Sequence, residues 1–125
     1  MPRRILVVED DDKSRRLLVD VLGWHGYEVS AAASGEEGLA LARAERPDAA
    51  LLDIQLPGID GFDVLAGLRS APFHARIPAI AVTASVMDED RRRIIGAGFD
   101  AYVGKPVNIR QLIASLEKVL AEVMS

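Results

Sequence analysis

The 125-residue chain contains no cysteine and only two histidines. The absence of cysteine excludes disulfides, thiolate zinc sites and cysteine nucleophiles, and two histidines are too few to build an imidazole metal cage. No apolar run approaches the roughly 20 residues that a membrane-spanning helix needs, and the first residues lack a signal-peptide pattern. The 15 Lys and Arg are outnumbered by 19 Asp and Glu, and the net charge of −4 disfavours nucleic-acid binding. We therefore expect a cytoplasmic protein that works with carboxylates, hydroxyls and lysine.

Short apolar runs alternate with longer amphipathic segments along the whole chain. Strands are predicted over residues 5–8, 28–32, 49–53, 77–83 and 101–103. Helices are predicted over about 13–24, 34–45, 62–68 and 88–96, and from 109 into the last residues. Five strand–helix pairs in strict alternation are typical of an α/β domain with a parallel sheet covered by helices on both faces. No repeat or linker interrupts the pattern, so we expect one domain over residues 1–125.

Local signals set the ends of several predicted helices. Ser34 and Asn108 are expected N-caps, because their side-chain oxygens can accept hydrogen bonds from the first helical turn. Asp11 or Asp12 is expected to do the same for the first helix. That helix is predicted to bury one stripe, formed by Leu17, Leu18, Val21 and Leu22.

Other conspicuous side chains are interpreted as structural. Trp24 is expected to serve packing and not function, and the basic run at 91–93 is expected to form a solvated helix face because it follows three acids. His25 and His74 are expected to lie in loops, with no role as a ligand or base.

The polar residues that end the apolar runs share one position in such a sheet. Glu9 and Asp10 follow the first predicted strand, and Asp53 ends the third. Thr83 ends the fourth strand, and Lys105 follows the fifth. Ligands of open parallel sheets bind beyond the carboxyl ends of the strands. We therefore expect these five side chains to meet at one edge of the sheet.

Three carboxylates at close range repel one another unless a cation lies among them. An all-oxygen cluster suits a hard cation, and Mg²⁺ is the expected one because it pairs a few carboxylates with waters and a phosphate oxygen. Such a site could hold a phosphoryl group. Asp53 would attack phosphorus, the metal and Lys105 would neutralise the transferring oxygens, and Thr83 would donate a hydrogen bond. The product would be an acyl phosphate, a labile mixed anhydride suited to a transient signal.

Four sequence segments carry a resemblance to a known family over essentially the whole chain. They are ILVVEDD at 5–11, LLDIQLPGIDG at 51–61, AVTA at 81–84 and AGFDAYVGKP at 97–106. With these motifs in this order, the chain resembles the receiver domains of two-component response regulators. It is most similar to stand-alone DivK-type regulators and to the receivers of hybrid histidine kinases. The resemblance implies a doubly wound, flavodoxin-like (βα)5 fold with strand order 2-1-3-4-5.

The resemblance also implies roles for individual residues. Asp53 corresponds to the phosphoacceptor and Thr83 to the switch hydroxyl. Lys105 corresponds to the phosphate-pairing lysine, and its bond to Pro106 is often cis in the family. Tyr102 occupies the position of the aromatic residue that turns inward when Thr83 moves. The implied metal ligands are Glu9, Asp10, Asp53 and the backbone carbonyl of Gln55.

These roles predict a switch that accepts a phosphoryl group from a histidine kinase or a histidine phosphotransfer protein. Phosphorylation is expected to remodel the face formed by the fourth helix, fifth strand and fifth helix, which a downstream protein partner reads. No enzymatic activity is expected beyond self-catalysed phosphotransfer and slow autodephosphorylation, and neither nucleic acid nor membrane is an expected partner. Two alternatives stay open: a receiver that belongs to a hybrid kinase or larger regulator, and a docking module that works without phosphorylation.

Two other functions fit the same residues less well. An aspartyl phosphatase needs a second Asp two residues after its nucleophile as general acid, and position 55 is Gln. A flavin protein of the same topology needs a phosphate loop rich in Ser, Thr and Gly, whereas residues 9–12 are all acidic. Gln55 and Ser85 would instead border the path of the water that hydrolyses the acyl phosphate.

Overall fold

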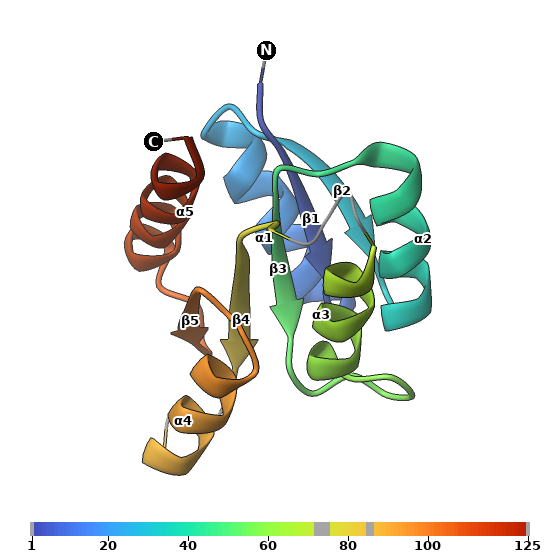
Figure 1. Ribbon diagram of the computed structural model, residues 1–125. Coiled ribbons are helices and arrows are strands. Elements are labelled where there is room, and N and C mark those ends of the chain that lie inside the picture. Colours follow the sequence, from blue (N-terminus) through green and yellow to red (C-terminus); the bar gives the residue numbers. More distant parts are fainter. Residues whose placement is uncertain (1, 72–75, 85–86, 125) are drawn as a thin grey trace.

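A five-stranded parallel sheet crosses the centre of the computed structural model, which describes residues 2–71, 76–84 and 87–124, with side chains to residue 122. The strands are β1 (Arg4–Val8), β2 (Glu28–Ala32), β3 (Ala49–Asp53), β4 (Ala79–Thr83) and β5 (Ala101–Gly104). They lie in the order β2-β1-β3-β4-β5 (Figure 1). This arrangement confirms the predicted doubly wound α/β fold.

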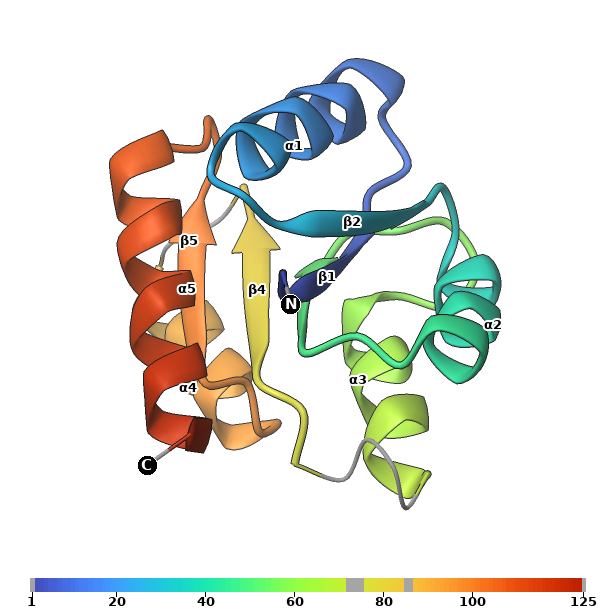
Figure 2. The ribbon, with the colours of Figure 1, turned by 90° about the horizontal axis from the view of Figure 1, so that it is seen from above.

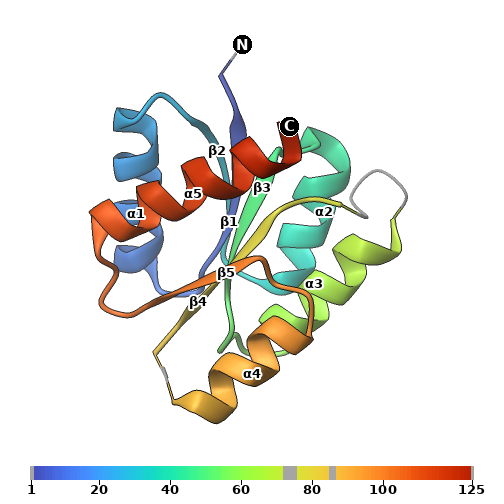
Figure 3. The ribbon, with the colours of Figure 1, turned by 60° about the vertical axis from the view of Figure 1, so that its left-hand side comes forward.

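Helices cover both faces of the sheet. They are α1 (Asp12–Trp24), α2 (Gly35–Glu45), α3 (Gly61–Ser70), α4 (Asp88–Gly96) and α5 (Ile109–Met124). Two of them, α1 and α5, pack on one face, and α2, α3 and α4 pack on the other (Figures 2 and 3). Within the described residues, every helix is too short or too polar to cross a bilayer.

Apolar strand residues bury side chains on both faces of the sheet. In β1, Ile5 and Val7 join the core under α1 and α5, whereas Leu6 and Val8 join the core under the other three helices. This alternation follows from the two-residue period of a strand. An apolar run without polar interruption is therefore what a strand between two helical layers requires.

The helix caps lie where the sequence predicts them. Of the two candidate acids before α1, Asp11 is the cap, and its carboxylate accepts a hydrogen bond from the Ser14 amide at 2.9 Å. The Ser34 hydroxyl accepts from the Glu37 amide at the start of α2. Asn108 accepts from the amide three residues later at the start of α5. Each cap satisfies one of the amides that the first helical turn leaves unpaired.

One strand is shorter than predicted. β4 begins at Ala79, two residues after the predicted start at residue 77. Ile77 and Pro78 are buried, but proline has no N–H to donate to a strand ladder. The Pro78 carbonyl still accepts a hydrogen bond from the Ala50 amide of β3. The apolar run therefore begins two residues before the regular strand.

Two apolar side chains of α1 face solvent, contrary to the prediction. Leu17 is 49% exposed and Trp24 is 90% exposed. The buried stripe consists of Leu18, Val21 and Leu22. At about 100° per residue, Leu17 lies about 95° from the centre of this stripe and Trp24 about 115° from it. Both side chains are therefore directed away from the core although they lie on the same helix.

Residues 91–93 of α4 are exposed, as predicted for a solvated face, and two of these arginines also cover aromatic rings. The Arg93 guanidinium lies 4.2 Å from the centroid of the Phe62 ring in α3. The Arg91 guanidinium lies 5.6 Å from the centroid of the Tyr102 ring in β5. Both distances are within the range of cation–π attraction. Ile94 is the buried residue of α4, and these contacts add to its attachment.

Gly61, the first residue of α3, lies against the backbone that follows Asp53. Its amide donates a hydrogen bond to the Ile54 carbonyl at 3.2 Å. A Cβ atom at Gly61 would lie 2.5 Å from the Asp53 carbonyl oxygen and 2.9 Å from the Ile54 Cα. Neither distance is compatible with nonbonded contact, and both neighbours are backbone. The missing side chain therefore lets α3 begin directly beside the end of β3.

We expect the Gly61→Ala variant to lower the free energy of unfolding by about 1–3 kcal/mol, because the added methyl must displace backbone. Gly23→Ala is the matched control, since a Cβ at Gly23 of α1 meets no atom within 4 Å. It should raise the free energy of unfolding by about 0.5–1 kcal/mol through helix propensity. Urea denaturation of both variants tests this, and a Gly61→Ala protein as stable as wild type would show that the close approach is no constraint.

Candidate functional site

The carboxyl ends of four strands bring polar side chains to one edge of the sheet. Glu9 directly follows β1, and Asp53 is the last residue of β3, the neighbouring strand. Thr83 is the last residue of β4, and Lys105 directly follows β5. These residues are far apart in the chain, and parallel pairing places them at the same edge.

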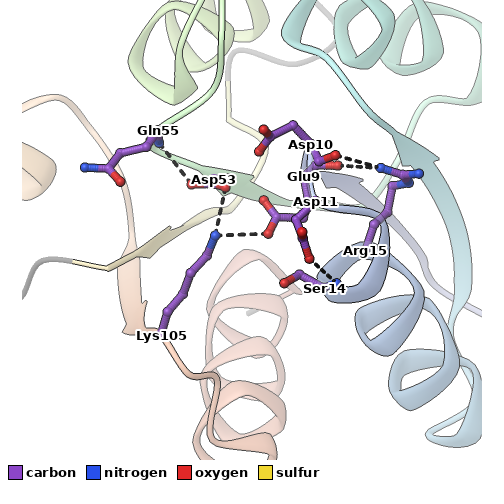
Figure 4. Close-up of polar contacts among 8 residues, drawn as sticks. All are labelled: Glu9, Asp10, Asp11, Ser14, Arg15, Asp53, Gln55 and Lys105. Carbon is purple, nitrogen blue, oxygen red and sulfur yellow. Dashed lines mark hydrogen bonds and ion pairs between the residues drawn. The ribbon is translucent and has the colours of Figure 1, made fainter.

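Lys105 joins two buried carboxylates. Its Nζ lies 2.9 Å from Glu9 Oε1 and 2.9 Å from Asp53 Oδ2 (Figure 4). Glu9 is 2% exposed and Asp53 is 3% exposed, so both acids are shielded from solvent. The Lys105–Pro106 peptide bond is cis. Buried carboxylates lose their hydration, and hydrogen bonds must compensate for that loss. Lys105 donates one such bond to Glu9 and one to Asp53.

The close packing of these charges shifts two pKa values. Burial raises the pKa of Glu9 to about 7, and the nearby Asp53 carboxylate adds to this effect while Lys105 opposes it. Burial alone would lower the pKa of Lys105, but its bonds and charge interactions with Asp53 and Glu9 outweigh burial and raise it. Glu9 and Asp53 thus share a single ammonium group.

Asp10 completes an acidic cluster with these two residues. One carboxylate oxygen from each of Glu9, Asp10 and Asp53 lies within 4.8 Å of the others. Glu9 Oε2 is buried and accepts no hydrogen bond from any described residue. A buried oxygen without a partner, beside two further carboxylates, fits the all-oxygen ligand set of a hard divalent cation.

The other two acids of the loop have structural contacts. Asp11 caps α1, and its hydrogen bonds from the Ser14 backbone and side chain lower the pKa of its carboxyl. Asp12 pairs with Arg15 three residues later. Sequence reasoning missed Arg15, which also contacts the loop backbone; its pairing with Asp12 follows from helical spacing, but its contacts to the loop do not.

Gln55 takes part in the site through its backbone. Its amide donates a hydrogen bond to Asp53 Oδ1 at 2.9 Å, while its side chain is exposed. Asp53 therefore accepts from Gln55 on one oxygen and from Lys105 on the other. These two bonds set the orientation of the carboxylate. The predicted role of the Gln55 carbonyl as a metal ligand stays a prediction.

Thr83 ends β4 at the edge of the sheet that carries the cluster, whereas Tyr102 lies within β5. Thr83 is 3% exposed and lines a cavity of about 260 Å³ with Gln55, Phe62 and Arg93. Tyr102 is half-buried against the core of the α2, α3 and α4 face.

The sequence also singled out two histidines and a serine. His25 is exposed beyond the end of α1. His74 and Ser85 lie outside the described residues.

Comparisons with known proteins agree over nearly the whole chain. A family model described as the response regulator receiver domain matches residues 5–117. The polar-differentiation response regulator DivK of Brucella anthropi is 38% identical over 122 residues, which make up 98% of this chain and 99% of that protein.

Solved structures share the fold. The chemotaxis protein CheY4 of Vibrio cholerae is 28% identical, with a TM-score of 0.91 over 95% of this chain and 99% of its own. The receiver domain of the sensor histidine kinase PA1611 of Pseudomonas aeruginosa is 30% identical, with a TM-score of 0.88 over 97% of this chain and 99% of its own. That structure has a magnesium ion coordinated in its active-site cleft.

Receiver domains in general bind Mg²⁺ in an acidic pocket and interact with histidine kinases or phosphotransfer proteins and with downstream partners. They are signalling domains and not enzymes of the classical kind. The matches in sequence and structure and the acidic cluster lead to the same conclusion. The chain belongs to the response regulator receiver domains of two-component systems, a family whose general function is phosphorylation-dependent signalling.

Proposed function

We propose that Asp53 is the phosphoacceptor of this receiver domain, with Mg²⁺ held by Glu9, Asp10, Asp53 and the Gln55 backbone carbonyl. One observation carries the proposal: the buried Asp53 carboxylate contacts the Lys105 ammonium and lies in one cluster with two further carboxylates. A nucleophile, a cation and an oxygen-only ligand set are thus within reach of one phosphoryl group.

The residues divide the chemistry among them. A carboxylate oxygen of Asp53 forms a P–O bond while the P–N bond of a phosphohistidine breaks, and the electron pair of that bond remains with the imidazole. Lys105 neutralises charge on the transferring oxygens, and the Thr83 hydroxyl donates a hydrogen bond to one of them. Bound Mg²⁺ would supply further positive charge against repulsion between the phosphoryl group and the carboxylates. The chain catalyses this transfer itself and slowly hydrolyses the product, with Gln55 bordering the path of the water.

We propose that phosphorylation changes the protein surface that a downstream partner binds. Thr83 moves toward the phosphoryl group, and Tyr102 turns inward into the space it leaves. Tyr102 lies beneath Arg91 of α4, so motion of its ring disturbs an existing contact of that helix. We propose that a downstream protein binds the face formed by α4, β5 and α5, where Ile95 and Met87 are exposed apolar residues. The phosphoryl donor is a histidine kinase or a histidine phosphotransfer protein.

Residues 1–125 are proposed to be one receiver domain, and the same chemistry applies if it belongs to a hybrid kinase or larger regulator. A docking module that works without phosphorylation is the competing proposal. The intact combination of Asp10, Asp53, Thr83 and Lys105 favours phosphorylation, because burying carboxylates beside one another is costly and a docking surface does not require it.

The Asp53→Asn variant should lose labelling by acetyl phosphate or by a phosphohistidine donor, because an amide is not a nucleophile for phosphorus. Intact-mass spectrometry measures the phosphoryl adduct. Asp20→Asn is the matched control, since Asp20 is an exposed acid on α1, and it should label like wild type. Stoichiometric labelling of the Asp53→Asn protein would mean that another residue is the acceptor.

Removal of Mg²⁺ with a chelator should stop labelling of the wild type. Conversely, Mg²⁺ at 100 times its dissociation constant should raise the free energy of unfolding by about 2.7 kcal/mol, because the ion binds only the folded cluster. Thermal melts with and without Mg²⁺ measure this gain, which Asp10→Asn should reduce and Asp20→Asn should preserve. Identical labelling kinetics in chelator would contradict the metal site.

The Thr83→Ala variant should still be labelled on Asp53 but should lose the phosphorylation-dependent NMR shifts of the α4 and β5 amides. The reason is that its side chain has no hydroxyl to follow the phosphoryl group. Thr83→Ser keeps the hydroxyl and should keep those shifts. If Thr83→Ala shows the same shifts as wild type, the hydroxyl does not couple the site to this face.

A further inference from the structure

Arg15 of α1 lies behind the acidic loop and contacts its backbone. Its Nη1 atom lies 2.9 Å from the Glu9 carbonyl oxygen and 3.4 Å from the Asp10 carbonyl oxygen. Its Nη2 atom donates to the carboxylate of Asp12. Figure 4 shows the guanidinium on the α1 side of the loop, away from Lys105. One planar group thus connects the loop residues Glu9 and Asp10 with Asp12, the first residue of α1, through fixed donor directions.

The two basic residues at this loop contact different parts of the acids. Lys105 donates to carboxylate oxygens of Glu9 and Asp53, which are candidate metal ligands. Arg15 donates to the backbone carbonyl oxygens of Glu9 and Asp10, and none of its described hydrogen bonds is to the carboxylate of either residue. Its contacts therefore hold the loop backbone without competing with a cation for ligand atoms.

We propose that Arg15 is a positioning residue for the metal site. It holds the backbone of Glu9 and Asp10 so that both carboxylates face Asp53, although the three acids repel one another. Without it, the loop must become ordered when the cation binds, and that ordering weakens affinity. The inference deepens the proposed function and rests on the magnesium site proposed there.

Electrostatics and positioning predict opposite signs for loss of Arg15. A guanidinium near the site repels a divalent cation, so removal of its charge alone should tighten Mg²⁺ binding. Loss of its hydrogen bonds to the loop should weaken Mg²⁺ binding. Arg16, the next residue, is an exposed arginine on the same helix, and Arg16→Met therefore reports the effect of charge alone.

The test is isothermal titration of the folded wild type, Arg15→Met, Arg15→Lys and Arg16→Met with Mg²⁺. We expect Arg15→Met to bind Mg²⁺ about 10-fold more weakly than wild type, as for other residues that orient metal ligands. Arg16→Met should bind as tightly as wild type or slightly tighter. Arg15→Lys should fall between wild type and Arg15→Met, because one ammonium cannot reproduce the planar fork.

The outcomes separate the two levels of the proposal. If wild type binds Mg²⁺ and Arg15→Met binds it as tightly as Arg16→Met, Arg15 does not position the site, while the proposed function stands. The same holds if urea denaturation shows that Arg15→Met is destabilised and its Mg²⁺ affinity is unchanged, which would mark a purely structural role. If Arg15→Met does not fold, Arg15→Lys decides: weaker binding than wild type supports the role, and equal binding overturns it. A wild type without Mg²⁺ affinity overturns the proposed metal site itself.

Discussion

The shared contact of Lys105 with Glu9 and Asp53 is the interaction on which the arrangement of the site depends. Two buried carboxylates on neighbouring strands repel one another, and their separation in the chain means that only the fold keeps them together. Lys105 follows β5, two strands away from β3, and its ammonium lies 2.9 Å from each acid. The strand order β1-β3-β4-β5 and the length of a lysine side chain are thus both needed to place one positive charge between them.

The single ammonium group of Lys105 cannot balance the charge of three carboxylates or fill all their hydrogen-bonding positions. Two features of Glu9 agree with this. Glu9 has a raised pKa because its charged form is buried beside Asp53, and its second oxygen has no hydrogen-bond partner among the described residues. A purely structural cluster would be more stable with apolar side chains of similar size. Buried carboxylates that lower stability in this way are typical of a functional site, such as one that binds a cation and then an anionic group.

The sequence predicts the strands, helices and caps better than it predicts the tertiary contacts between side chains. Strand ends and caps follow from local patterns, and the position of Lys105 at the same edge as Glu9 follows from parallel topology. The expected burial of Leu17 and packing of Trp24 were wrong because the rotation of about 100° per residue directs both side chains well away from the buried stripe of α1. The backbone contacts of Arg15 could not be predicted, because they depend on how a loop folds back on the following helix. Local patterns thus locate the acids, whereas tertiary contacts determine how they are held.

The attachment of α4 bears on the proposed coupling between the phosphorylation site and the surface of this helix. Among described side chains, α5 buries five apolar residues in the core, whereas α4 buries Ile94. The rest of its attachment includes cation–π contacts of Arg91 with Tyr102 and of Arg93 with Phe62. Such contacts contribute less than apolar burial and can be exchanged for water. A shift of Tyr102 would therefore disturb one of these contacts, and little buried apolar area has to be exposed if this helix moves.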